Sequence, residues 1–181
     1  MAIYDAAETP TTAEFLVGFT DLREFLSLAK ELETSRKLFE FLDDLAGRMS
    51  AVVENSGGRI LKFIGDASLV VFSGEDADVG VRSLLKLKEV ADSFIADKGF
   101  PSRLKVSAHY GEATIGPFGP EARLDILGET VNRAAMVERG PHRSEFAITP
   151  EVFRRLKPET RTLFREFTPP VVYLAKEASN A

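Results

Sequence analysis

Residues 57–72 read GGRILKFIGDASLVVF and place two apolar runs, ILKFI and ASLVVF, on either side of a Gly-Asp pair. Two such runs joined by a pair that is favoured in tight turns predict a β-hairpin with Gly65 and Asp66 at its tip. Aspartate is a common turn residue, so a turn role alone is one explanation of Asp66. A carboxylate between two buried arms also invites a search for a partner elsewhere in the chain.

The segments around the hairpin predict the fold class. A strand is expected at 14–22 and an amphipathic helix over about 38–53, and a second helix follows the hairpin at about 73–98. Further segments are expected as follows: strands at 103–111, 113–116 and 123–127, a short helix at 128–140, and a Pro150-led helix followed by the C-terminal segments TLFREF and VVYLA. This order predicts an α+β fold with a ferredoxin-like βαββαβ core, extra C-terminal strands, and an antiparallel sheet with helices packed on one face.

Composition places the chain among ordinary globular domains. It has 181 residues, of which 44% are hydrophobic and 28% charged, a net charge of −5 and no cysteine. We expect one domain over 13–176, a flexible N-terminal arm at 1–12 and a tail at 177–181. The absence of a basic run, a signal-peptide pattern and a long apolar stretch predicts a cytoplasmic protein whose partners are neither nucleic acid nor membrane.

The predicted topology gives Asp66 a partner. The strand that ends near Asp21 would lie in the middle of the sheet beside the hairpin, so both carboxylates would reach the same end of neighbouring strands. Two carboxylates at that separation repel each other unless a cation lies between them. The sequence therefore predicts a divalent metal site at Asp21 and Asp66.

Four segments resemble the class III adenylate and guanylate cyclase catalytic domain, in order and in spacing: FTDLREF (19–25), GGRILKFIGDASLVVF (57–72), VSAHYGEATIGPFG (106–119) and LDILGETVNRAA (124–135). The most specific pieces are K-F-I-G-D-A and D-I-L-G-E-T-V-N. The resemblance implies conversion of ATP to cyclic AMP and pyrophosphate with two Mg²⁺ or Mn²⁺ ions, which Asp21 and Asp66 would bind. It also implies a head-to-tail homodimer, or a heterodimer with another cyclase domain.

The resemblance assigns further roles to single residues. Lys62 and Asp125 match the positions that select adenine, where a Lys donates to the ring and an Asp accepts from the amine. Asn132 matches the catalytic asparagine that positions the ribose. Phe25 matches a residue of the segment whose backbone amides cradle phosphate. Each also has a structural reading, such as a solvated strand position for Lys62 or a turn acceptor for Asp125.

Four departures from the family pattern concern the triphosphate. Met136 stands where the family has its transition-state arginine, and Glu24 and Leu26 stand in the phosphate-cradling segment. The fourth departure is a lysine missing from the C-terminal hairpin, where this chain has Thr168-Pro169-Pro170 and where Lys176 comes too late to replace it.

These departures leave two hypotheses. The first is an adenylate cyclase, a weak one or one that needs residues of another protein; Arg133 and Arg139 each lie three residues from Met136 and are candidates to replace the arginine. The second is a catalytically inactive, cyclase-like module for nucleotide binding, dimerisation or regulation. A diguanylate cyclase is disfavoured because no G-G-[DE]-[DE]-F turn is present. His109 is expected to be a buried core or interface histidine rather than a base.

Overall fold

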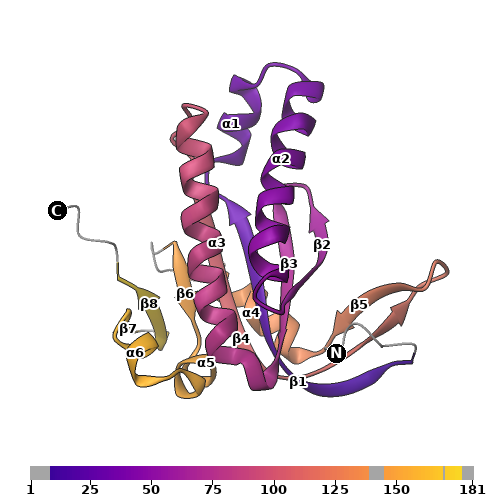
Figure 1. Ribbon diagram of the computed structural model, residues 1–181, viewed down its shortest axis with the longest axis vertical. Helices are drawn as coiled ribbons and strands as arrows, with labels where there is room; N and C mark the ends of the chain where they lie inside the picture. Colours follow the sequence, from indigo (N-terminus) through magenta and orange to yellow (C-terminus); the bar gives the residue numbers. More distant parts are fainter. Residues whose placement is uncertain (1–8, 139–144, 169, 177–181) are drawn as a thin grey trace.

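The computed structural model describes residues 9–138, 145–168 and 170–176 (Figure 1). The elements, in chain order, are β1 (Thr11–Leu22), α1 (Phe25–Glu31), α2 (Ser35–Glu54), β2 (Arg59–Ile64), β3 (Ala67–Ser73), the 3₁₀ turn η1 (Gly74–Asp76), α3 (Ala77–Asp97), β4 (Leu104–Phe118), β5 (Arg123–Leu127), α4 (Glu129–Glu138), β6 (Phe146–Ile148), α5 (Pro150–Arg155), α6 (Pro158–Arg161), β7 (Phe164–Phe167) and β8 (Val172–Ala175).

The strands form one sheet in the order β2-β3-β1-β4-β6-β8-β7, and β5 pairs with β4. The fold class is therefore confirmed: β1 lies in the middle beside the β2–β3 hairpin, and the only parallel pair among the described strands is β4 with β6. The two strands expected at 103–111 and 113–116 are a single strand. Unbroken pairing with β1, from Leu22 opposite Leu104 to Thr11 opposite Ile115, keeps Gly111 within β4.

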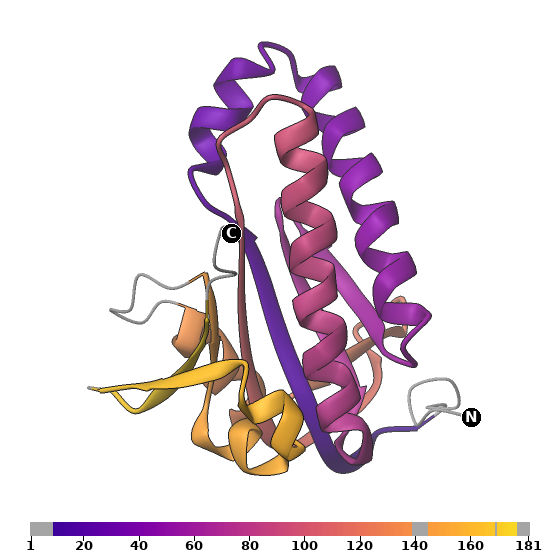
Figure 2. The same cartoon turned by 60° about the vertical axis from the view of Figure 1, so that its left-hand side comes forward.

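The long helices α2 and α3 run side by side over one face of the sheet (Figures 1 and 2). Thr34 caps α2, because its hydroxyl accepts a hydrogen bond from the backbone N–H of Lys37 at 3.2 Å. Leu16 of β1 and Val70 of β3 point into the core that these helices cover, together with Leu84 of α3. This layer holds the end of β1, and therefore Asp21, in place.

The short helix α4 packs on the opposite face of the sheet, so the expectation that helices cover one face only is wrong. Phe15 and Val17 of β1 form a second core with Ala134 of α4. The reason lies in β1, whose residues 15–17 are all fully buried, as in a strand that is covered on both faces. The Ser107 hydroxyl donates to the backbone oxygen of Ala134 at 2.9 Å and ties α4 to β4.

The C-terminal strands β7 and β8 form an antiparallel hairpin, in which Phe167 pairs with Val172. The prolines that follow Thr168 in the sequence therefore do not abolish the hairpin. The Lys176 ammonium group donates to the backbone oxygen of Thr162 at 2.8 Å. At the other end of the chain, Thr11 and Thr12 belong to β1 rather than to an N-terminal arm. The rest of that arm (1–8), the tail (177–181) and Arg139 lie outside the described residues.

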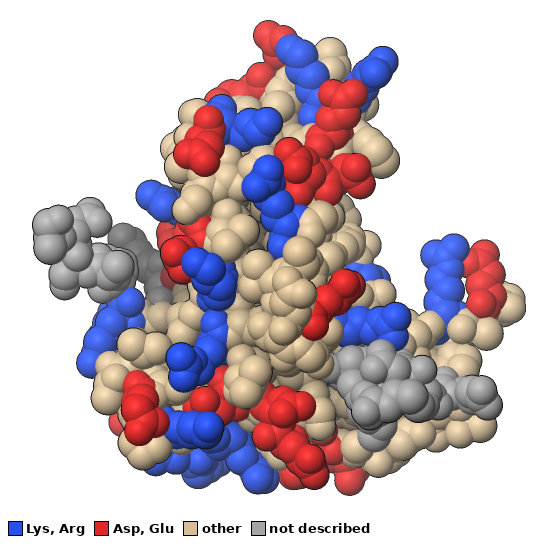
Figure 3. Space-filling view, in the orientation of Figure 1, with Lys and Arg blue, Asp and Glu red and all other residues tan. Residues whose placement is uncertain are grey.

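Acidic and basic side chains are interspersed over the face that α2 and α3 form (Figure 3). Several pair along a helix, such as Arg36 with Glu40 at 2.9 Å. No helix in the described part of the chain is long and apolar enough to cross a membrane.

Candidate active site

Two carboxylates meet where β1 ends beside the β2–β3 hairpin. Asp21 lies one residue before the end of β1, and Asp66 lies in the two-residue turn between β2 and β3. The turn is tight because Gly65 adopts a φ of +64°, which a glycine tolerates easily. The backbone N–H of Leu22 donates to Oδ2 of Asp66 at 3.2 Å and fixes the turn against β1. The structure thus brings together the two aspartates that the sequence predicted to be neighbours.

The electrostatics of this pair are unfavourable without a cation. Burial, a side-chain hydrogen bond to Asp66 and the charge of Asp66 together raise the pKa of Asp21 from 3.8 to about 6. The charge of Lys105, which stands opposite Asp21 in the β1–β4 pairing, acts in the other direction but does not cancel these effects.

The donor set of the pair fits a hard divalent cation. Mg²⁺ prefers oxygen ligands and is often held by only one or two carboxylates, with waters and substrate phosphates completing the shell. Among the described residues no group of three or more acidic, histidine or cysteine side chains could hold a metal ion. Asp21 and Asp66 therefore suit an ion that shares its coordination with a bound phosphate.

A second charged pair joins β2 to β5. The Nζ atom of Lys62 lies 2.6 Å from Oδ2 and 2.8 Å from Oδ1 of Asp125. The Lys62 side chain is 40% exposed and that of Asp125 17%, so the pair can still be reached from solvent. The backbone N–H of Ile126 donates to the same carboxylate at 2.8 Å and orients it. Lys62 is therefore not merely a solvated strand position, and Asp125 lies in a strand rather than in a loop.

Both charged pairs belong to one face of the sheet. Directly opposed residues of an antiparallel pair point to the same face. Lys62 is opposite Leu69 in β3, and Leu69 is opposite Phe19 in β1. Asp21 is two residues beyond Phe19 and so shares its face. This is the face that α2 and α3 leave open and that α4 covers in part.

The other predicted site residues divide between the two sides of the sheet. Asn132 and Met136 are exposed on α4, and Met136 is 70% exposed. Phe25, the first residue of α1, is half-buried and packs against the core under α2 and α3. Glu24, just before α1, is exposed and has a φ of +55°, an uncommon conformation for a residue other than glycine.

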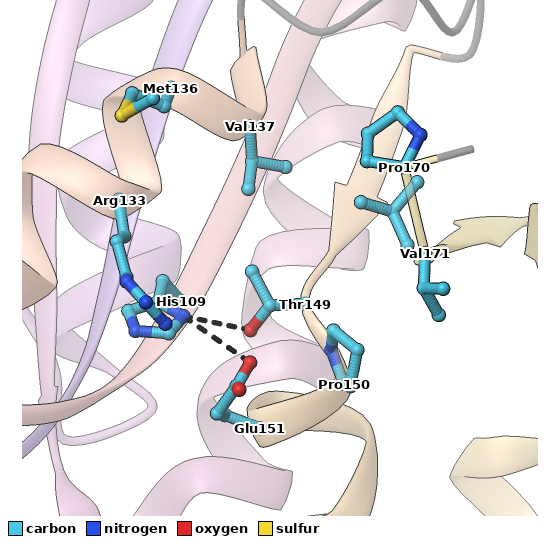
Figure 4. Close-up of a pocket in the computed structure, with 10 residues that line it drawn as sticks. His109, Arg133, Met136, Val137, Thr149, Pro150, Glu151, Pro170 and Val171 are labelled. Carbon is cyan, nitrogen blue, oxygen red and sulfur yellow. Dashed lines mark hydrogen bonds and ion pairs between the residues drawn. The ribbon is translucent and has the colours of Figure 1, made fainter. Parts of the chain in front are cut away.

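A polar cluster of His109, Thr149 and Glu151 lies beside α4, and the sequence predicted only that its histidine is buried (Figure 4). His109 is 4% exposed, and its Nδ1 atom lies 2.9 Å from the hydroxyl of Thr149 and 3.7 Å from Oε2 of Glu151. Burial lowers the pKa of His109, and the nearby charge of Arg133 lowers it further, against the charge of Glu151. His109 is thus the buried histidine that the sequence predicted, although its partners come from the distant segment 149–151.

Glu151 completes this cluster. Its pKa is lowered although burial alone would raise it, because its own backbone N–H and the Thr149 hydroxyl donate to it and because positive charge lies near. Thr149 therefore links the Nδ1 atom of His109 to the Glu151 carboxylate. The direction of the His109–Thr149 hydrogen bond depends on which ring nitrogen of His109 carries the proton.

Comparison with known proteins identifies the family. The sequence model described as the adenylate and guanylate cyclase catalytic domain matches residues 8–169. The chain belongs to this family. An adenylate cyclase of Anabaena cylindrica is 26% identical over 166 residues, which are 84% of this chain and 33% of that protein. The chain thus spans about a third of that relative.

Solved structures agree on the fold. The adenylyl cyclase CyaB of P. aeruginosa superposes with a TM-score of 0.79 at 21% identity, covering 95% of this chain and 98% of that one. The catalytic core of a rhodopsin-guanylyl cyclase with converted specificity, in complex with ATPαS, gives 0.77 at 20% identity and covers 92% and 98% of the two chains. Adenylyl and guanylyl cyclases therefore share this architecture.

Proposed function

We propose that the chain is an adenylate cyclase domain, which converts ATP to cyclic AMP and pyrophosphate. The observation that carries the proposal is the presence, on one face of one sheet, of an electrostatically strained carboxylate pair, Asp21–Asp66, and of the Lys62–Asp125 pair. The first pair suits a metal-bound polyphosphate and the second a purine. Family membership supports the same chemistry.

In the proposed reaction the 3′-oxygen of the ribose forms a bond to the α-phosphorus. The bond from that phosphorus to the oxygen bridging to the β-phosphate breaks, pyrophosphate leaves, and the hydroxyl proton passes to solvent. Divalent cations bound at Asp21 and Asp66 would polarise the α-phosphate and neutralise charge on the leaving group. Asn132 would orient the ribose from α4.

Recognition of adenine rests on Lys62 and Asp125. The Lys62 ammonium group can donate to a ring nitrogen, and the Asp125 carboxylate can accept from the exocyclic amine. A guanine presents a carbonyl oxygen where adenine has its amine, so the same carboxylate would face an acceptor and be left unpaired. The ion pair would have to open to admit the base, and its partial exposure is compatible with that.

Exposed apolar side chains favour a dimer that completes the site. Phe63 and Ile64 at the end of β2 are 42% and 58% exposed, and Phe118 and Leu127 on the β4–β5 arm are 56% and 50% exposed. These side chains flank the segments that carry Asp66 and Asp125, so a second cyclase domain packed head to tail would cover them. Either a second copy or a different cyclase chain could serve.

A catalytically inactive binding module is the second candidate. It is favoured by Met136, whose exposed thioether offers no positive charge for the developing phosphate charge, and by the acidic Glu24 before α1. Arg133 does not replace the missing arginine in this structure, since its Nε atom bonds Glu129 at 3.0 Å and it lines the cavity beside His109.

The deciding experiment is an assay of purified protein with ATP and Mn²⁺, in which cyclic AMP and pyrophosphate are both quantified over hours. The proposed reaction forms the two products in equal amounts. An Asp21→Ala variant is the control, and GTP is tested in parallel. Product above the control, with ATP preferred, supports the proposal. ATP that binds without turnover supports the inactive module, and a preference for GTP contradicts the assigned base specificity.

A further inference from the structure

Two buried hydroxyl groups join β1 to β3 next to the carboxylate pair. Oγ1 of Thr20 lies 2.7 Å from Oγ of Ser68, and the two residues are 0% and 1% exposed. They stand directly opposite each other in the pairing of β1 with β3, and they form the last pair of that ladder before Asp21. The reaction proposed above gives these two hydroxyls no role.

The hydroxyl pair lies on the face of the sheet that α2 and α3 cover (Figure 2). Leu22, which shares a face with Thr20 because strand side chains alternate, belongs to the core under these helices, and so does Val106, which is opposite Thr20 in β4. Within the described part of the chain, each hydroxyl bonds only the other. One of the two O–H protons is then left without an acceptor in apolar surroundings, so burial alone would favour two apolar side chains here.

The pair acts with a second hydrogen bond to hold Asp21 on both sides. Leu22, the residue after Asp21, donates its backbone N–H to Oδ2 of Asp66 at 3.2 Å. Thr20, the residue before it, bonds Ser68, which lies two residues beyond Asp66. Apolar contacts have no preferred direction, whereas a hydrogen bond restricts both the distance and the angle between its groups. The two bonds together therefore set how far the end of β1 lies from the hairpin turn.

We propose that Thr20 and Ser68 are positioning residues that hold Asp21 and Asp66 at the separation that a shared divalent cation requires. Neither hydroxyl would touch the ion, because both lie on the opposite face of the sheet from Asp21. Groups that orient metal ligands from outside the coordination shell are typically worth about 10- to 100-fold in metal affinity. That the carboxylates bind a cation rests on the proposed function, whereas the effect of the hydroxyl pair on the turn does not.

The first test needs neither metal nor nucleotide. Thr20→Val keeps the shape of the side chain and removes its hydroxyl, and Thr12→Val makes the same change at the other end of β1, where the Thr12 hydroxyl lies 2.8 Å from that of Thr114. Amide hydrogen exchange is measured by NMR on the full chain. In Thr20→Val the Leu22 N–H, which binds Asp66, should exchange at least tenfold faster relative to the slowest core amides, which report global unfolding. In Thr12→Val this ratio should not change.

The second test measures Mn²⁺ binding to the full chain from the electron paramagnetic resonance signal of the free ion. Asp21→Ala defines the part of the binding that depends on Asp21. We expect Thr20→Val and Ser68→Ala each to weaken that part about tenfold, and Thr12→Val to bind like the wild type. The exchanged pair, Thr20→Ser with Ser68→Thr, keeps both hydroxyls and the total side-chain volume, so it should restore the affinity to within about twofold.

Three results would overturn the proposal. The first is an exchange rate of the Leu22 N–H in Thr20→Val that rises no more than that of the core amides. The second is a Mn²⁺ affinity that is the same in Thr20→Val and Thr12→Val, and the third is an exchanged pair that fails to restore it. A wild type without Asp21-dependent Mn²⁺ binding contradicts the metal site of the proposed function, and the Leu22 exchange rate then decides the role of the hydroxyl pair by itself.

Discussion

The variant Asp21→Asn should make the protein more stable in the absence of divalent cations. The pKa of Asp21 is raised from 3.8 to about 6. Each tenfold change in an acidity constant corresponds to about 1.4 kcal/mol, so ionising Asp21 costs about 3 kcal/mol more in the folded chain than in the unfolded chain, before screening by solvent. Asp21 is only partly buried, so solvent reduces this figure, and we expect a gain of about 1 kcal/mol in the free energy of unfolding at pH 8. Asparagine removes the charge but can still donate a hydrogen bond to Asp66.

The pH dependence provides the sharper test. The folded protein holds the Asp21 proton more tightly than the unfolded chain, so the wild-type free energy of unfolding carries a contribution that falls as pH rises from 3.8 to about 6. The gain of the variant should therefore be near zero at pH 4 and complete above about pH 6. His109, whose pKa is lowered, gives a contribution of opposite sign, because it disfavours the folded state as pH falls below 6.5. That contribution is present in both proteins and cancels in their difference.

The measurement is urea unfolding followed by circular dichroism in EDTA at pH 4.5, 6 and 8, with Asp43→Asn on the exposed side of α2 as the control. Excess Mn²⁺ should then reverse the order. A ligand at a hundredfold its dissociation constant stabilises the wild type by about 2.7 kcal/mol, whereas the variant offers the ion one carboxylate fewer. An Asp21→Asn protein that is less stable than the wild type at pH 8, or a gain that does not depend on pH, would refute the strained-pair argument.

Three further changes test other parts of the structure. Lys62→Met should lower kcat/KM for ATP at least tenfold and reduce the preference for ATP over GTP, measured with both nucleotides side by side, since it leaves Asp125 without its partner. Met136→Arg should raise turnover of ATP while changing the melting temperature little, because the side chain is 70% exposed. Gly80→Ala should lower the free energy of unfolding in urea by about 1–3 kcal/mol, because the new Cβ would lie 2.6 Å from the Leu16 side chain. Gly47→Ala is the control: its Cβ would have nothing within 4 Å, so the change should stabilise α2 by up to about 1 kcal/mol.

The sequence was sufficient for the features that depend on local pattern and chain order. The apolar runs around Gly65 and Asp66 predicted the hairpin, and the order of elements placed β1 beside it, which brought Asp21 to Asp66. The sequence predicted helices on one face of the sheet only, and this prediction was wrong. Residues 15–17 are apolar without alternation, so their pattern does not show whether a helix covers one face of the strand or both. Only the tertiary structure shows that α4 takes the second face.

Contacts that depend on register could not be read from the sequence. Lys105 faces Asp21 only because β1 and β4 pair in one particular alignment. His109 meets Thr149 because the parallel pairing of β4 with β6 sets Ala108 opposite Ile148. A shift of one residue would turn His109 to the other face. Lys62 and Asp125 are 63 positions apart in the sequence, and only the family resemblance indicated that they act at one site.

The strain at Asp21 bears on the choice between an enzyme and an inactive module. Burial of the ionised Asp21 carboxylate beside the charge of Asp66 destabilises the folded chain, and replacement of Asp21 by an amide would relieve this cost while keeping the hydrogen bond from Leu22 to Asp66. Strain of this kind persists where a ligand makes it useful, since a bound cation converts the repulsion into affinity. A module that only pairs with another domain through Phe63 and Ile64 would have no use for it. The carboxylate pair therefore argues for a metal–nucleotide site and against a module that only pairs with another domain. Under the proposed function, the uncharged Met136 would lower the rate of the reaction without changing its chemistry.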